Sequence, residues 1–284
     1  MDCDILIIDG NSLLFKAFYG VPARIYGKDN KLIHGLFGFI GILLKTIISY
    51  HPTYLVLAFD NELGSFRDKI DGGYKSNRIR DWSGISEEKS PFSQLPKIYK
   101  ALNYLKLKHY EILDYEADDV IAECVKRYGE NNKIIILSTD YDLLQLVNDN
   151  AKLFFPRGKN SILYGVNEVK NKFGILPELI PEFKALVGDK SDNIKGIHGI
   201  GEKTAQKLFK QYSSLEEIYN KLDDIEPNSL RQKLLDNKER VFKNLNLIRL
   251  KERVDLPFDL ECLKVPSNLV SQKTMQILRD IDLV

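Results

Sequence analysis

Three short apolar segments of the chain each end at or just before an aspartate. They are residues 5–8 before Asp9, residues 55–59 before Asp60, and residues 134–137, which Asp140 follows closely. Uninterrupted apolar and β-branched runs of this length are typical of strands buried on both faces, as in a parallel sheet. Helical patterns over residues 36–44, 95–105 and 118–128 alternate with them, so we expect an α/β core with right-handed crossovers. Ligands of such sheets bind beyond the carboxyl ends of the strands, where these three aspartates would lie.

Size and composition fit a globular protein with one large domain or two closely packed ones. Of the 284 residues, 44% are hydrophobic and 29% are charged, which argues against disorder and against a coiled coil. The alternating pattern covers residues 1–170, and the pattern of residues 171–284 is helical. Residues 67–93 are polar, charged and rich in Gly and Ser, which predicts a mobile excursion from the core with a functional role.

Charge, cysteine and histidine content exclude several classes of protein. The net charge is only +1, so any nucleic-acid site must be local. No apolar run reaches the ~18 residues of a membrane span, and the acidic start is unlike a signal or transit peptide. Three widely separated cysteines, Cys3, Cys124 and Cys262, predict buried thiols in a reducing cytoplasm rather than a disulfide framework. The four scattered histidines give no support to a zinc site or a Ser-His-Asp hydrolase.

Further acidic residues accompany the three strand-end aspartates. Together they form nine candidate site residues in five segments: Asp9, Asp60, Glu116, Asp118, Asp119, Asp140, Asp142, Asp189 and Asp192. Each has a structural explanation of its own, because acids favour the first turn of a helix, cap helices after strands and form turns. The spacing of Asp189 and Asp192 would also place both on one face of a helix.

The expected convergence of these acids at one sheet edge favours a metal site. Two like charges ~4 Å apart repel by ~4 kcal/mol at an effective dielectric of 20, so a group of carboxylates needs cations. A set of hard oxygen ligands without Cys or His indicates Mg²⁺, for which Mn²⁺ can substitute. The number of acids suggests two ions, and a pair of metals ~3.5–4 Å apart is a known arrangement for in-line attack on a phosphodiester.

A basic segment follows the second expected strand. Residues 66–80 contain five cations and two acids, which a solvated charged loop would explain. Its position next to a candidate ligand strand makes it an expected phosphate clamp, with Lys75 and Arg78 on one helical face. Tyr74 could stack on a base or pack in the core.

A glycine-rich segment opens the amphipathic helix expected from residue 202. Residues 196–205 approach a P-loop pattern, but Glu202 intervenes and no strand precedes it, which argues against ATP binding. A glycine hairpin that leads into a helix N-terminus would instead offer backbone N–H groups to a phosphate. Lys203, Lys207 and Lys210 would add a cationic face, and plain packing of two helices is the structural alternative.

These segments resemble the 5′-nuclease (flap endonuclease) superfamily, and above all the 5′→3′ exonuclease domain of bacterial DNA polymerase I and its stand-alone relatives. The matching pieces appear in the family's order within residues 4–210: residues 8–12, 59–60 with 66–67, 74–78, 116–121, 138–142, and 188–193 with 199–205. The resemblance implies a PIN-like parallel-sheet catalytic domain over residues 1–170, with an arch or clamp at about 67–93. It implies a helical region over 171–284, with a helix-three-turn-helix element at about 185–212.

The resemblance also implies roles for individual residues. The first metal site would use Asp9, Asp60, Glu116, Asp118 and Asp119, and the second Asp140, Asp142, Asp189 and Asp192. Lys75 and Arg78 would contact the scissile phosphate, Tyr74 would stack near the cleaved nucleotide, and Arg67 belongs to the same catalytic set. Duplex DNA would bind at Gly196, Gly199, Gly201, Lys203, Thr204 and Lys207, with a K⁺ ion held by main-chain carbonyls.

The implied function is that of a stand-alone, Mg²⁺-dependent, structure-selective 5′-nuclease. Its substrate would be DNA with a 5′ flap, a nick or a free 5′ end, including RNA-primed ends, cut during replication and repair by a monomeric cytoplasmic enzyme. Recognition would depend on the shape of the DNA rather than on its bases. Two alternatives remain open: a PIN-type ribonuclease and a catalytically silent protein that binds DNA junctions.

Overall fold

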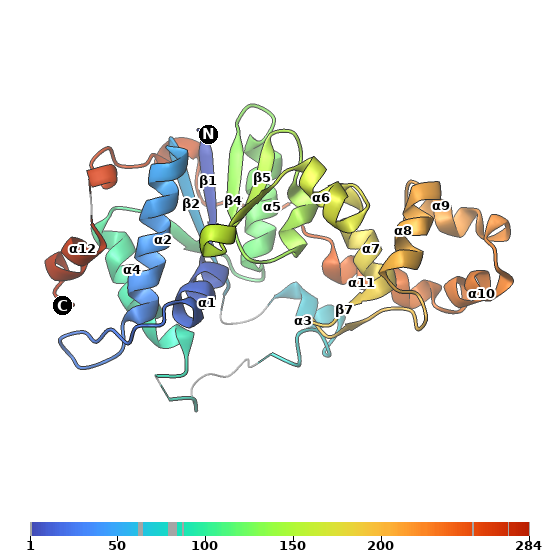
Figure 1. Cartoon of the computed structure of the whole chain (residues 1–284), viewed down its shortest axis with the longest axis horizontal. Coiled ribbons are helices and arrows are strands. Elements are labelled where there is room, and N and C mark those ends of the chain that lie inside the picture. Colours follow the sequence, from blue (N-terminus) through green and yellow to red (C-terminus); the bar gives the residue numbers. More distant parts are fainter. Residues whose placement is uncertain are drawn as a thin grey trace.

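A six-stranded sheet forms the centre of the larger part of the molecule (Figure 1). The computed structural model describes residues 2–61, 65–78, 84–86, 88–251, 253–271 and 273–283. The strands lie in the order β3-β2-β1-β4-β5-β6, and only β6 is antiparallel to its neighbour. Their bounds are β1 (Ile5–Asp9), β2 (Tyr54–Phe59), β3 (His109–Glu111), β4 (Ile134–Leu137), β5 (Ala151–Phe155) and β6 (Ile162–Tyr164).

The three strands predicted from the apolar runs are confirmed as the parallel centre of this sheet. Ile8 of β1 pairs with Leu57 of β2 on one side and with Leu137 of β4 on the other. This register ends the three strands at the same edge. The residues that follow them, Asp9, Asp60 and Asp140, therefore emerge at one rim of the sheet.

Helices cover both faces of the sheet, and alternate strand residues divide between them. Leu6 and Ile8 pack with the helices of one face, while Ile5 and Ile7 pack with those of the other. The first face carries α1 (Gly10–Gly20), α2 (His34–Tyr50) and α4 (Leu95–Tyr104), and the second carries α5 (Ala117–Tyr128). The helices expected at 36–44, 95–105 and 118–128 are thus confirmed, because their apolar stripes match these two buried faces.

The segment between β2 and α4 has short elements of its own, and its residues Arg67 and Tyr74 are buried. A capping box at Ser65 starts the short helix α3 (Phe66–Ile70), and turns follow as far as residue 78. The 3₁₀ helix η1 (Pro91–Gln94) then leads into α4. Residues 79–83 and 87 of the expected arch lie outside the described residues.

The second half of the chain is mostly helical and extends away from the sheet (Figure 1). Its helices are α6 (Val166–Phe173), α7 (Ile180–Val187), α8 (Glu202–Gln211), α9 (Leu215–Asn220), α10 (Asn228–Asp236), α11 (Lys238–Ile248) and α12 (Thr274–Asp280). The hairpin β7 (Gly188–Asp189) and β8 (Ile194–Lys195) lies between α7 and α8. Shorter 3₁₀ helices are η2 (Asp142–Leu146), η3 (Gly158–Asn160), η4 (Pro177–Leu179), η5 (Leu222–Asp224), η6 (Leu260–Leu263) and η7 (Leu269–Ser271).

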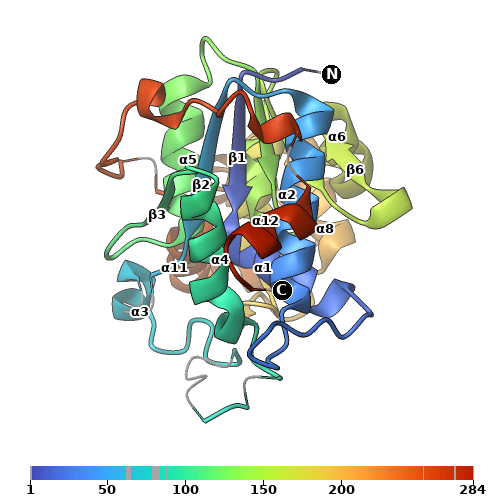
Figure 2. The ribbon, with the colours of Figure 1, turned by 90° about the vertical axis from the view of Figure 1, so that its left-hand side faces the viewer.

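The last segment of the chain returns to the α/β core. Figure 2 shows α12 lying across α2 and α4, where Ile277 and Leu278 are buried. The predicted division near residue 170 falls inside α6. None of the described helices is long and apolar enough to cross a bilayer.

Candidate active site

The acids at the strand ends are held by the starts of the next helices. Asp9 caps α1 through a hydrogen bond of 2.9 Å from the Ser12 backbone N–H. Its other carboxylate oxygen accepts a 2.6 Å hydrogen bond from the Ser138 hydroxyl. Asp60 accepts one of 2.8 Å from the backbone N–H of Ala117, at the start of α5. Capping thus explains the position of Asp9 and fixes its carboxylate at the sheet rim.

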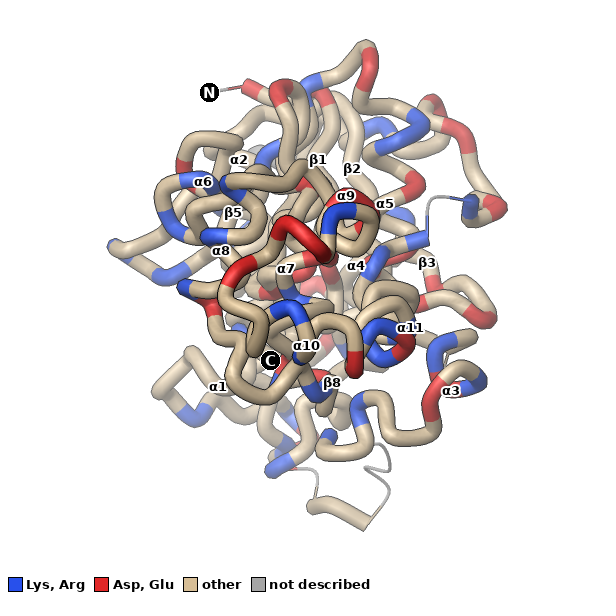
Figure 3. Tube along the Cα trace, turned by 90° about the vertical axis from the view of Figure 1, so that its right-hand side faces the viewer, with Lys and Arg blue, Asp and Glu red and all other residues tan. Residues whose placement is uncertain are grey.

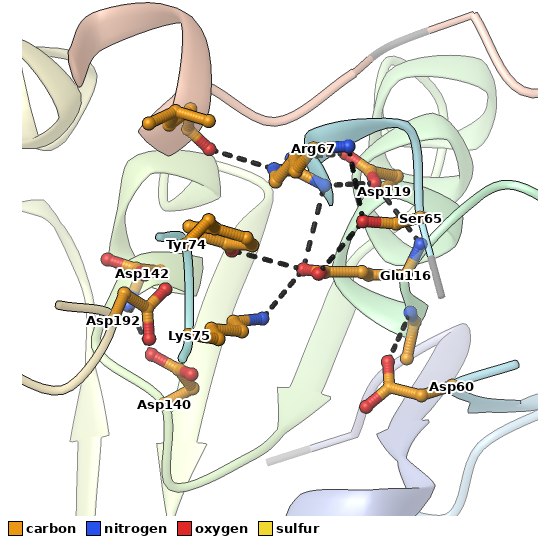
Figure 4. A network of polar contacts seen from close by, with 12 residues as sticks. Asp60, Ser65, Arg67, Tyr74, Lys75, Glu116, Asp119, Asp140, Asp142 and Asp192 are labelled. Atoms are coloured by element: carbon orange, nitrogen blue, oxygen red, sulfur yellow. Dashed lines mark hydrogen bonds and ion pairs between the residues drawn. The ribbon is translucent and has the colours of Figure 1, made fainter. Parts of the chain in front are cut away.

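Glu116 is the centre of a network of polar contacts at the N-terminus of α5 (Figure 4). Its carboxylate accepts hydrogen bonds from the Ser65 hydroxyl at 3.1 Å, from the Tyr74 hydroxyl at 3.3 Å and from the Lys75 ammonium at 2.8 Å. Burial alone would raise the pKa of Glu116, but Lys75 and Arg67 outweigh it and hold that pKa below its usual range. Glu116 is therefore an anion that keeps the Lys75 ammonium inside the site.

Asp119 lies on the opposite side of this network, and both of its oxygens are engaged. The guanidinium of Arg67 donates to them at 2.6 and 2.7 Å, and the backbone N–H of Lys251 donates at 2.8 Å. Arg67 is 1% exposed and Asp119 is fully buried. In this arrangement both oxygens of Asp119 accept hydrogen bonds from Arg67 and from backbone N–H groups.

The acids at the rim lie close enough to raise the pKa values of Asp9 and Asp118. Burial raises the pKa of Asp9 to about 7, and the charges of Asp60 and Asp140 add to this effect. Desolvation, then Asp140 and Asp9, raise the pKa of Asp118 well above its usual value. Within the described part of the chain, the Asp118 carboxylate accepts no hydrogen bond. Carboxylates raise one another's pKa in this way only when they lie close together, as the sequence predicts for these acids.

A second group of acids lies between the start of η2 and the β7–β8 hairpin. The Lys184 ammonium, from α7, pairs with Asp142 and also with Asp189 at 2.7 Å. Burial and then the charge of Asp140 raise the pKa of Asp142 to about 7, although Lys184 opposes them. Asp192 pairs with Arg78. In Figure 4, Asp140, Asp142 and Asp192 lie on the opposite side of Lys75 from Glu116.

Two local predictions about helix faces are wrong. Asp189 and Asp192 lie in a β-hairpin and its turn rather than on a helix, because Gly188 takes a φ of +89° and ends α7. Lys75 and Arg78 lie in consecutive turns, since Lys75 itself has a φ of +51°. They nevertheless meet the same acids, because the Lys75 N–H donates to the Asp192 carbonyl at 3.0 Å. Tyr74 is 5% exposed and packs in the core.

The glycine hairpin predicted to bind DNA leads into α8. The Ile197 N–H donates to the Leu186 carbonyl at 2.8 Å, which ties the turn to α7. Gly199 has a φ of +80°, and Gly201 is the N-cap of α8. Lys203 and Lys207 are exposed on α8, and Thr204 is partly exposed. Gly199, Gly201, Lys203 and Lys207 are exposed on the helical part, and Gly196, four residues after Asp192, lies against the end of α7.

Sequence reasoning assigned no role to three residues that organise the site: Ser65, Ser138 and Lys184. Ser138 lies in the matching piece 138–142, and a serine three residues before Asp68 is a capping-box signal. Lys184 lies five residues before Asp189 on a short helix. Its spacing in the sequence does not predict that it pairs with two acids.

Comparisons with known proteins place the chain in a family. Residues 4–174 match the model described as 5′-3′ exonuclease, N-terminal resolvase-like domain, and residues 175–269 match 5′-3′ exonuclease, C-terminal SAM fold. A 5′-3′ exonuclease of Aquifex aeolicus is 32% identical over 287 residues, which cover 98% of this chain and 95% of that protein. The chain belongs to the 5′-3′ exonuclease family, which confirms the resemblance.

Other relatives are longer. The DNA polymerases I of Caldicellulosiruptor bescii and Bacillus subtilis are 36% and 33% identical, each over 90% of this chain. The chain spans only 30% and 28% of their lengths. The similarity is therefore to one part of those proteins.

Solved structures confirm the fold class, an α/β PIN-like core with a helical second part. The flap endonuclease of bacteriophage T5, in complex with DNA and metal ions, has a TM-score of 0.72 at 22% identity, over 98% of this chain and 99% of that one. The catalytic core of Rad2 in complex with a DNA substrate has a TM-score of 0.60 at 14% identity, over 99% and 93% of the two chains. These likenesses concern the fold alone.

Proposed function

We propose that this chain is a divalent-metal-dependent, structure-selective 5′-nuclease that hydrolyses phosphodiester bonds of DNA at flaps, nicks and free 5′ ends. One observation carries the proposal: carboxylates from five separate segments gather at one rim of a parallel sheet, where Lys75 and Lys184 lie among them. Membership of the 5′-3′ exonuclease family supports the same reaction.

The donor set fits Mg²⁺, with Mn²⁺ as a substitute, because it consists of carboxylates. We assign Asp9, Asp60, Glu116 and Asp118 to one ion, and Asp140, Asp142, Asp189 and Asp192 to a second. Asp119 positions Arg67. Among the described residues, no three acids are yet arranged to hold a metal, and Lys75, Arg78 and Lys184 pair with the acids instead. Bound cations would supply Lewis acidity that activates water and offsets the charge of the attacked phosphate.

The cationic side chains of the site would act on the scissile phosphate. Burial alone would lower the pKa of Lys75, but Glu116 and its other neighbours raise it well above the usual value, so the ammonium stays charged. Its partner Glu116 can turn to a metal ion and free Lys75 for a non-bridging phosphate oxygen. Arg78 is about half exposed and can make the same exchange from Asp192. Tyr74 holds this turn in place by packing in the core.

Duplex DNA would bind on the glycine hairpin and α8. Gly201 leaves the first N–H groups of an amphipathic helix directed outward, and Lys203 and Lys207 are exposed beside them. We propose that Gly196, Gly199 and Thr204 complete this backbone contact, with a K⁺ ion held by main-chain carbonyls of the turn. Such contacts position DNA without reading its sequence.

We also propose the type of 5′ end, the oligomeric state and the cellular location. The substrates would include RNA-primed 5′ ends, because contacts to phosphates do not require deoxyribose. The protein would act as a monomer. It would work in the cytoplasm, where the free thiols of the buried Cys3 and Cys124 remain reduced.

A cleavage assay with a 5′-labelled flap tests the proposal. We expect cuts near the junction that depend on added Mg²⁺ and stop with EDTA, whereas Asp140→Asn binds the flap in EDTA but does not cut it. Cleavage of RNA in preference to the flap would support the ribonuclease alternative instead. A wild-type protein that binds flaps but never cuts them with Mg²⁺ or Mn²⁺ would be a silent junction-binding protein.

A further inference from the structure

A hollow of about 700 Å³ opens on the outer side of α3 and α5, behind the Arg67–Asp119 pair. We call it the basic groove. Five cations line it: Lys69 of α3, Lys126 of α5, and Arg249, Lys251 and Arg253 of the segment after α11. Phe66 and Tyr115 also line it, and Asp114 is the one acid in its described lining.

Two cations of the basic groove pair with acids, and in both pairs the cation is more than half exposed to solvent. Lys69 lies 3.5 Å from Asp114, and both side chains are exposed, so this pair is weak. Arg249 lies 3.1 Å from Glu182 and is more than half exposed. Figure 3 shows Lys and Arg near α3 and α11, together with some Asp and Glu. For a chain with a net charge of +1, this is a local concentration of cations.

Aromatic rings form part of the same surface. The rings of Phe66 and Tyr115 are partly exposed, with centroids 6.2 Å apart and planes inclined by 60°. The Lys251 ammonium lies 5.0 Å from the centre of the Phe66 ring. Cations combined with aromatic faces are the features that bind single-stranded nucleic acid, because rings stack on unpaired bases while cations follow the phosphates. A duplex would hide its bases from these rings.

The groove and the active site share their walls. Phe66 precedes Arg67, and Tyr115 precedes Glu116, so consecutive residues face the groove and the site. The Arg67 Nε donates to the Leu247 carbonyl at 2.8 Å, and the Lys251 N–H donates to Asp119, which ties the segment after α11 to the same wall. A strand that leaves the site past α3 would meet this surface next.

We propose that the basic groove binds the single-stranded 5′ arm of the DNA substrate after the arm has passed the active site. The inference rests on the proposed nuclease function and extends it, because it assigns the arm a docking surface outside the catalytic residues. The groove would hold the arm through its phosphates and bases without regard to sequence. It would therefore favour substrates with long arms over those with short ones.

The double variant Lys251→Ala/Arg253→Ala tests this. Both side chains are exposed, and alanine keeps the Lys251 N–H that binds Asp119, so the fold should persist. Flaps with arms of about two and about 16 nucleotides bracket the range of single-strand site sizes. We expect the KM for the long arm to rise about 3–10-fold with kcat unchanged, and the salt dependence of binding to fall by about 1.4 in slope for two lost phosphate contacts. The short arm should be unaffected.

The matched control is Lys45→Ala/Lys100→Ala, which removes two exposed lysines from α2 and α4 on the other face of the sheet. The control should leave the KM unchanged for both the long-arm and the short-arm flap. Lys251→Glu/Arg253→Glu should raise the KM for the long-arm flap more than the alanine variant does. Equal losses on both arms, or no loss on the long arm, would overturn the groove proposal. Arm-dependent binding of the wild-type protein in EDTA is measured separately. A protein that never cuts but still loses long-arm binding in the variant would refute the nuclease function and leave the groove standing.

Discussion

Arg67 and Asp119 form a two-point ion pair in which both side chains are removed from solvent. The two guanidinium nitrogens donate to the two carboxylate oxygens at 2.6 and 2.7 Å, while a third nitrogen of Arg67 donates to the Leu247 carbonyl. The pair therefore joins α3, α5 and the end of α11. It also brings the Arg67 guanidinium within 3.6 Å of Glu116.

Removing one partner of this pair should destabilise the fold. We predict that Asp119→Ala lowers the free energy of unfolding by about 3–5 kcal/mol, because it leaves a buried guanidinium without its counter-charge. Urea denaturation measures this change. Asp119→Asn should cost less, since it keeps one acceptor oxygen. If instead Asp119→Asn abolished cleavage while stability stayed at the wild-type level, Asp119 would be a metal ligand as the sequence first suggested.

Lys75 should contribute to the chemical step rather than to binding. We predict that Lys75→Ala reduces the single-turnover cleavage rate about 10²–10³-fold, the effect of losing one charged donor to a developing oxyanion. Flap affinity in EDTA should change little. Lys75→Arg is the matched control, because it keeps the charge and should recover part of the rate. A parallel loss of affinity and rate would show that Lys75 mainly binds DNA.

The raised pKa of Asp9 predicts how stability depends on pH when metal is absent. Its pKa is about 7 in the fold and near 3.8 in the unfolded chain, so between these values the folded state holds the extra proton. The stabilisation of the folded state by this proton on Asp9 is complete below about pH 4. It is lost as the pH rises through about 7. We predict that Asp9→Asn, compared with the wild type in EDTA, unfolds at a higher temperature at pH 8 and not at pH 4.

The same variant should lose Mg²⁺-dependent cleavage. Calorimetric or fluorescence melts in EDTA, with and without added Mg²⁺, separate the two effects. Mg²⁺ should raise the melting temperature of the wild-type protein above pH 7 and have a smaller effect on Asp9→Asn. Identical pH profiles for the two proteins in EDTA would contradict this account of Asp9.

Lys184 should stabilise the metal-free protein by bridging Asp142 and Asp189. We predict that Lys184→Met lowers the melting temperature in EDTA, because two buried carboxylates then lose their shared cation. Added Mg²⁺ should restore more stability to this variant than to the wild type, since the metal replaces the missing charge. Lys170→Met on α6 is exposed and serves as the control. No difference in the Mg²⁺-dependent shift would argue against a metal ion at these two acids.

Two glycines of the DNA-binding hairpin should respond differently to alanine. A Cβ at Gly196 would lie 2.2 Å from the Val187 carbonyl, so Gly196→Ala should displace the hairpin and cost about 2 kcal/mol or more. A Cβ at Gly201 meets nothing within 4 Å, so Gly201→Ala should cost at most about 1 kcal/mol. Thermal melts and flap binding in EDTA check both. Equal stability of the two variants would show that the hairpin can shift to accommodate a Cβ at Gly196 without a large loss of stability.

Much of this architecture follows from local sequence patterns. The strands β1, β2 and β4 are continuous apolar runs, and the helices between them have apolar stripes of the right period, so both were predictable. The aspartates after these runs could be assigned to one rim because parallel strands end together. Local geometry was less predictable where a residue takes a positive φ. Lys75 and Gly188 do so, and the helical faces expected for Arg78 and Asp192 became turns and a hairpin.

By itself the sequence determined the three central strands with the helices between them, the edge of the sheet where the acids gather, and the family. Only the tertiary structure decided which charges neutralise one another: Arg67 with Asp119, Lys75 with Glu116, and Lys184 with two acids at once. The physical reason is that periodicity and apolar burial are encoded over neighbouring residues, and a short window of sequence displays them. Ion pairing depends on side chains from distant segments that meet only after the chain has folded.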